Sequence, residues 1–266
     1  MQPGFHQFPD YQQLVAHIIR SGTGKWLKPP GYDANDTILC RFWAAGGSGA
    51  CGRGNIAASG GEGGSYLEIA YRYGDFPDSG ADYSIGVGGD GKTRSSDGQT
   101  NGVDGGDTTV TIGGITFTVK GGQGGICDAT TATTTPQTSS KVGTFETVGV
   151  APYGAGNGGS GDLNTDTASD GGDAPFAGAG GAGAFVRTNP IHAGGDGGTS
   201  MHGGDGGDGA SATLGGTATA TAGEAPGGGG GAAVSSGGTA NSGDGARGEI
   251  QFVLMRGWRP TLLSAA

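Results

Sequence analysis

Residues 86–93 read GVGGDGKT, which matches the phosphate-binding pattern GxxxxGK[ST]. That pattern binds phosphate when a strand precedes it and a helix follows, because the loop amides and the lysine then surround the anion. Residues 94–106 have no helical periodicity. Chance matches are expected in a chain this rich in glycine, so we assign no nucleotide site here.

Residues 203–208 read GGDGGD, which fits the start of a calcium-binding GGxGxD repeat. Such sites need tandem nonapeptides that share ligands, and the preceding stretch 194–199 reads GGDGGT instead. The aspartates in glycine-rich loops thus have two interpretations, solubility or calcium binding by some of them. The four histidines lack the spacing of a zinc site; they are His6, His17, His192 and His202. We expect no metal and no cofactor.

Catalytic side chains are not marked by any motif. There is no serine elbow and no nucleophile–base pair, and nothing singles out paired carboxylates for glycoside hydrolysis. The odd number of unclustered cysteines does not make a disulfide framework, so Cys40, Cys51 and Cys127 are interpreted as reduced packing residues. The sequence therefore favours a protein that is not an enzyme.

Composition and net charge disfavour some classes of binding partner. Glycine makes up 65 of the 266 residues, and the formal net charge is −10. That charge disfavours nucleic acid and anionic membranes, because both attract basic surfaces. No apolar run approaches the roughly 18 residues of a membrane span, and the N-terminus does not resemble a signal peptide. We expect assembly in a cytoplasm, with any extracellular role following release of a particle.

An amphipathic segment opens the chain. Asp10 and Gln13 outline a capping box, and the apolar residues after Asp10 recur at helical spacing. A short helix of this kind needs something to pack on, either a partner or the following sheet. We interpret residues 1–31 as an attachment segment. Its candidate contacts are Phe5, Phe8, Tyr11, Leu14, Val15, Ile18, Ile19 and Trp26.

Residues 32–120 alternate as strands do. The run Thr37–Trp43 is apolar, and residues 66–73 place apolar and charged side chains on opposite faces. Gly113 and Gly114 separate two short strands, which is a hairpin signal. A strand at Glu249–Met255, within residues 248–258, is expected to close this domain and to complete its core with apolar side chains.

Residues 121–247 form the unusual part of the chain. From residue 194 to residue 217 the sequence runs in triplets, most beginning with two glycines. A polyproline-II-type helix has three residues per turn and no internal hydrogen bonds. Bare glycine edges let such helices approach one another and bond backbone to backbone. We therefore expect a bundle of polyglycine-II helices.

Loops between the glycine tracts carry isolated large side chains. On a backbone-built scaffold they are candidate recognition residues, although each could instead fill a gap in the bundle. They are Phe145, Tyr153, Phe176, Phe185, His192, Met201 and His202. The fold expected is thus mostly β and irregular. It has a short N-terminal helix, a small antiparallel β-sheet domain and a glycine-rich bundle of polyglycine-II helices with loops.

The order of short motifs resembles the glycine-rich domains of phage tail-fibre and tail-tip proteins. Trp26 and Pro29 match an opening Trp-x-x-Pro, residues 46–49 a GGxG turn and residues 85–88 a V-G-x-G strand end. Residues 245–250 match the closing strand. The triplet region is also similar in character to the polyglycine-II tip adhesins of T-even-type Salmonella phages, although this chain has a longer β-rich first half.

The resemblance implies a virion protein that binds a host outer-surface protein or glycan and contacts other tail proteins through its N-terminal segment. A homotrimer would suit a fibre. Three alternatives stay open: a structural protein without receptor recognition, an ice-binding protein, and a surface-glycan hydrolase.

Overall fold

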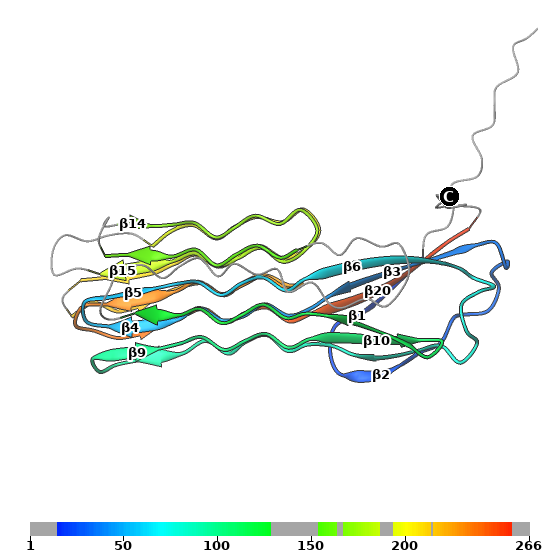
Figure 1. Ribbon diagram of the computed structural model, residues 1–266, viewed down its shortest axis with the longest axis horizontal. Helices are drawn as coiled ribbons and strands as arrows, with labels where there is room; N and C mark the ends of the chain where they lie inside the picture. Colours follow the sequence, from blue (N-terminus) through cyan, green and yellow to red (C-terminus); the bar gives the residue numbers. More distant parts are fainter. Residues whose placement is uncertain (1–14, 129–153, 164–166, 187–193, 214, 257–266) are drawn as a thin grey trace, which may run out of the picture.

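The structure is a computed structural model that describes residues 15–128, 154–163, 167–186, 194–213 and 215–256. It is elongated, with paired strands at one end and wavy glycine-rich segments running from them to short strands at the other (Figure 1). The described residues form strands and irregular segments and contain no helix. Accordingly, no helix in these ranges could cross a membrane.

Two sheets at one end pack as a sandwich, which we call the strand sandwich. The first has the order β1 (Val15–Ile19), β20 (Glu249–Met255), β3 (Thr37–Trp43), β6 (Tyr66–Arg72). The second has the order β11 (Ile115–Val119), β10 (Thr108–Ile112), β7 (Ala81–Ser84), β2 (Thr23–Trp26). The pairs in both sheets are antiparallel.

The sandwich encloses the main hydrophobic core. Alternate residues of β3 and β20 point inward, and Phe42, Phe252 and Leu254 are fully buried. Trp26 lies flat on Phe252, with ring centroids 4.0 Å apart. The expected closing strand is confirmed, because β20 pairs along its whole length with β3 despite their separation in sequence.

The expected N-terminal helix is wrong. Val15, Ile18 and Ile19 belong to strand β1, which pairs with β20 at the edge of the first sheet. Exposure along β1 alternates, so Ile19 packs against the core whereas Ile18 is 45% exposed. Trp26 is also a core residue rather than a flank of a helix. β-branched side chains favour a pleated sheet with a partner strand over an isolated helix.

The hairpin expected around Gly113 and Gly114 is confirmed. Strand β10 pairs with β11 across these two residues, and their φ angles are +59° and +83°. A two-residue turn with positive φ at both positions matches the twist of the flanking strands.

Glycine-rich segments connect the strand sandwich to the far end. They are residues 44–50, 59–65, 85–92, 101–107, 120–126, 154–160, 169–174, 177–183, 194–199, 203–209, 220–224, 227–232 and 242–248. These segments lie side by side as wavy ribbons in Figure 1. They come from both halves of the chain.

The hydrogen bonds between segments repeat every three residues. Segment 59–65 donates to three neighbours in rotation: Ser59, Glu62 and Ser65 to residues 120–126, Gly60 and Gly63 to 156–159, and Gly61 and Gly64 to 227–230. Its carbonyls accept from residues 44–50 and 178–181. Three residues per turn is the period of a polyproline-II-type helix. Backbone bonding to five neighbouring segments thus holds this segment in place.

Glycine is required where segments touch. A Cβ atom added to Gly61 would lie 2.1 Å from the carbonyl oxygen of Gly47, and one added to Gly229 would lie 2.2 Å from that of Gly61. Real Cβ contacts essentially never fall below 3.0 Å. The segments can therefore approach this closely only without side chains.

Aspartates complete the bonding at the surface of the bundle. The carboxylate of Asp205 accepts the N–H of Ser200 at 2.6 Å, and that of Asp208 accepts the N–H of Gly197 at 2.9 Å. Further examples, each accepting a backbone N–H of another segment, are Asp104, Asp107, Asp170, Asp173 and Asp244. The GGDGGD stretch therefore uses its carboxylates to join segments. In the described ranges, no group of three or more acidic, histidine or cysteine side chains is placed to hold a metal.

Short strands close the far end, and their bounds are as follows. One sheet is β12 (Cys127–Asp128), β5 (Ile56–Ala58), β15 (Ala184–Val186), and a small pair is β13 (Gly161–Asp162) with β14 (Thr167–Ala168). A third group is β16 (Ala210–Ala212), β18 (Ala233–Ser235), β4 (Cys51–Arg53), β9 (Gly98–Thr100). The last is β17 (Ala218–Thr219), β19 (Ala240–Asn241), β8 (Thr93–Arg94).

Candidate functional site

The outer face of the first sheet carries aromatic and charged side chains in register. Across β3 and β6, Trp43 lies opposite Tyr66 and Arg41 lies opposite Glu68. On the other side of β3, Gln251 of β20 lies opposite Arg41. Because side chains alternate along a strand, these five residues share the face that points away from the sandwich core.

Two turns of the glycine-rich bundle cover part of this face. One turn brings Phe176, and the other brings Met201 and His202, which are both exposed. Together with the five sheet residues, they line a cavity of about 220 Å³. The site therefore lies where the bundle meets the strand sandwich, and we call it the junction pocket.

Four rings form a row from the sheet to the outer turn. The centroids of Trp43 and Tyr66 are 4.8 Å apart and their planes are tilted by 40°. Tyr66 and Phe176 stack at 6.2 Å, and Phe176 and His202 stack at 5.2 Å with planes within 7°. These separations lie within the range of favourable aromatic pairs. The row gives the pocket an aromatic wall of tilted and stacked rings.

An ion pair forms the polar side of the pocket. The Arg41 Nε donates to Glu68 at 2.8 Å, and the Tyr66 hydroxyl donates to the same carboxylate at 2.7 Å. The side chains of Arg41 and Glu68 are 35% and 37% exposed, so solvent reaches both. Among the described lining residues, Glu68 is the one carboxylate. Its pairing with Arg41 leaves this side of the pocket polar but close to neutral.

Hydrogen bonds fix the two turns in place. The Trp43 Nε1 donates to the carbonyl oxygen of Phe176 at 2.9 Å, which ties the first turn to the sheet. In the second turn, the Ser200 hydroxyl donates to the carbonyl of Ala177 and accepts the N–H of Gly203, both at 2.8 Å. The rings that line the pocket are thus held before any ligand arrives.

The structure gathers three of the recognition candidates, namely Phe176, Met201 and His202. Phe185 lies elsewhere, in a small cluster with Ala57 and Leu163, where it is 1% exposed. Its side chain fills a gap inside the far end. Phe145, Tyr153 and His192 lie outside the described residues, as do the attachment candidates Phe5, Phe8, Tyr11 and Leu14.

The three cysteines are free thiols and are buried. Burial raises the pKa of Cys127 to about 12 and also raises the pKa values of Cys40 and Cys51. A thiol with a raised pKa is a poor nucleophile at neutral pH. These residues serve packing, as the sequence indicates.

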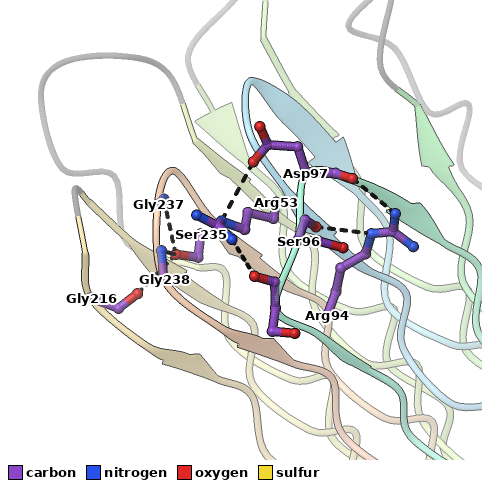
Figure 2. A network of polar contacts seen from close by, with 9 residues as sticks. Arg53, Arg94, Ser96, Asp97, Gly216, Ser235, Gly237 and Gly238 are labelled. Carbon is purple, nitrogen blue, oxygen red and sulfur yellow. Dashed lines mark hydrogen bonds and ion pairs between the residues drawn. The ribbon is translucent and has the colours of Figure 1, made fainter.

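Polar contacts organise the loops of the far end (Figure 2). Arg53 pairs with the carboxylate of Asp97 at 3.5 Å, and Arg94 donates to the carbonyl of Asp97 at 2.9 Å. Nearby, the Ser235 hydroxyl donates to the carbonyl of Gly216 at 2.8 Å. Arg53 and Ser235 thus join different loops of the far end, whereas Arg94 bonds within its own loop.

Sequence reasoning missed the sheet half of the junction pocket, which consists of Arg41, Trp43, Tyr66, Glu68 and Gln251. A signal existed, because strand alternation places Trp43 and Arg41 opposite the buried face of β3. Nothing local indicates that this face meets a turn 133 positions away in sequence.

The comparison with protein families gives one finding. Residues 20–254 match a family described as a glycine-rich domain. No curated protein matches the chain. The match spans the glycine-rich segments, the junction pocket and the strand sandwich except for strand β1.

Proposed function

We propose that this chain, which belongs to the glycine-rich domain family, is a non-enzymatic phage tail-fibre or tail-tip protein that binds the host surface. The order of its short motifs supports a tail protein. In this proposal the glycine-rich segments form a bundle of polyglycine-II helices, and turns on that bundle recognise the receptor. The three-residue period of the hydrogen bonds supports the helix type.

One observation carries the proposal most directly. Phe176, Met201 and His202 come from two separate turns and meet on one face, and Met201 is 82% exposed. Single exposed apolar side chains are common, but a cluster of them on one face marks a contact surface. Rigid turns that present aromatic and sulfur-containing side chains suit recognition.

The described chain ends support attachment at the strand sandwich. Strand β1 begins and strand β20 ends at the same end of the strand sandwich, because Val15 pairs with Leu254. Other tail proteins would bind at this end. The protein would reside in the virion tail after assembly in the host cytoplasm, as a homotrimer. Ile18, exposed on edge strand β1, is available for that contact.

The pocket chemistry favours binding over catalysis. Glycoside hydrolysis uses two carboxyl groups on either side of the bond that is cleaved. Among the described lining residues, Glu68 is the one carboxylate, and it already pairs with Arg41 and Tyr66. An uncleaved host-surface molecule is therefore the proposed ligand.

Adsorption to cells tests this function. The purified protein, fluorescently labelled, is incubated with a panel of bacterial strains beside a double variant, Met201→Ala with His202→Ala. The matched control is Val87→Ala, which removes another exposed apolar side chain, 75% exposed, from a different segment. We expect strain-restricted adsorption that the double variant loses and the control keeps. Adsorption to no strain would favour a structural role without recognition.

A further inference from the structure

The junction pocket is too small for a large ligand. Its volume of about 220 Å³ lies below the range of about 300–1,000 Å³ that is typical of drug-sized ligands. A single six-membered ring with its substituents is an occupant of suitable size. The site would then hold one unit of a longer molecule, and the rest of that molecule would lie along the surface.

The two walls of the pocket differ in chemistry. Phe176 and His202 form an aromatic wall, in which the two rings stack with centroids 5.2 Å apart. The other wall is polar and consists of Arg41, Glu68 and Gln251. It offers hydrogen-bond donors from the guanidinium and amide groups and acceptors from the carboxylate and amide oxygens. A ligand that fits both walls needs an apolar face and a rim of hydroxyl groups.

Charge selects further among such ligands. The Arg41 guanidinium is neutralised by Glu68 at 2.8 Å, so it is not available as an isolated cation for a phosphate or carboxylate. The chain as a whole carries a net charge of −10, which repels anionic ligands at long range. An uncharged ligand needs no unpaired cation in the pocket and is not repelled by the net negative charge.

We propose that the junction pocket binds one pyranose ring of a neutral host-surface glycan. The C–H groups of the sugar would contact the aromatic wall formed by the stacked Phe176 and His202, while vicinal hydroxyls would bond to the paired Arg41 and Glu68. The bonds that fix the turns lower the cost of ordering the site on binding. This inference rests on the proposed host-binding function and names the ligand class for its site.

Direct sugar binding by the isolated full-length protein tests the inference without cells. Methyl glycosides of neutral hexoses and of N-acetylhexosamines are titrated into ¹⁵N-labelled protein. The observed signal is the indole N–H of Trp43, which bonds to Phe176 at the base of the pocket. Its resonance is assigned by its loss in Trp43→Phe. We expect at least one glycoside to shift it saturably.

Variants localise the binding. His202→Ala removes an exposed ring from a turn held by other residues, so the fold is expected to persist, and unchanged unfolding confirms this. Loss of one aromatic contact in His202→Ala should raise the dissociation constant about two- to tenfold. The control Leu27→Ala, at another exposed side chain, should leave the dissociation constant unchanged. No saturable shift with any glycoside, or equal binding by His202→Ala, overturns the inference.

The two proposals fail separately. Strain-restricted adsorption without binding of any neutral sugar would overturn the glycan pocket and leave host binding standing, with a protein receptor as the occupant. Sugar binding without adsorption to cells would overturn the host-binding function alone.

Discussion

Replacing Gly61 by alanine should loosen the glycine-rich bundle. The new Cβ would lie 2.1 Å from the carbonyl oxygen of Gly47, whereas ordinary contact begins at 3.4 Å. The two segments must therefore separate by about 1 Å at this point. Two buried hydrogen bonds meet there, from Gly47 to Glu62 and from Gly230 to Gly47, both of 2.9 Å.

The expected magnitude follows from those two bonds. Leaving their groups unpaired costs about 2–6 kcal/mol, and the lower entropy of an unfolded chain with alanine offsets about 0.4–1 kcal/mol. We expect a net loss of about 1–5.5 kcal/mol in the free energy of unfolding. Denaturant unfolding followed by tryptophan fluorescence measures it.

The control is Gly216→Ala, whose Cβ would lie 3.2 Å from the carbonyl oxygen of Thr213 and 3.3 Å from the Ala212 Cβ. Small adjustments relieve that contact, so a change within about 1 kcal/mol is expected. Equal stability of the Gly61→Ala and Gly216→Ala variants would refute the view that close backbone contact holds the bundle together.

Three further outcomes are expected. The N–H and hydroxyl of Thr199 bond to the Asp173 carboxylate and lower its pKa from 3.8, so this carboxylate contributes stability above pH 3.8 that is lost as the pH falls through the lowered pKa. In Asp173→Asn the melting temperature should therefore fall less steeply at acid pH than in the wild type, and an equal fall would contradict this contribution. The buried thiols of Cys40 and Cys127 should resist a maleimide reagent at neutral pH until the protein unfolds, and rapid labelling of the native protein would be inconsistent with their burial. The proposed homotrimer should have three times the mass of one chain by light scattering, and a monomer mass argues against a trimer.

Strand alternation predicted much of the sandwich. Strands β3 and β20 have apolar side chains at every second position facing one core, and the two-glycine hairpin has one favoured geometry. These features are local, so the sequence encodes them directly. The triplet repeat likewise predicted that backbone hydrogen bonds between segments recur every three residues. Glycine has no side chain, so such segments contact one another mainly through backbone N–H and C=O groups.

The helix prediction failed for a physical reason. Val15, Ile18 and Ile19 fit helical spacing, but Val15 and Ile19 also lie on one face of a strand. Pairing with β20 decides between the two structures, and that partner lies more than 200 residues away. Helix propensity is a weak preference that tertiary pairing overrides.

The candidate site was predicted in part. Phe176, Met201 and His202 stood out because they interrupt glycine-rich sequence, but their neighbours Trp43 and Tyr66 looked like ordinary strand residues. Which segments lie side by side depends on how the chain turns between them, and every glycine tract offers much the same edge. The junction pocket therefore became visible only in three dimensions.

Blocking one surface at a time shows which end of the protein binds the cell. Single cysteines are introduced by Met201→Cys at the junction pocket and by Ser96→Cys in a loop of the far end shown in Figure 2. Each is coupled to a polyethylene glycol maleimide, because the native thiols are buried and unreactive. We expect the polymer at position 201 to abolish strain-restricted adsorption and the polymer at position 96 to leave it intact. Loss of adsorption only with the polymer at position 96 would contradict binding at the junction pocket and place the receptor at the far end.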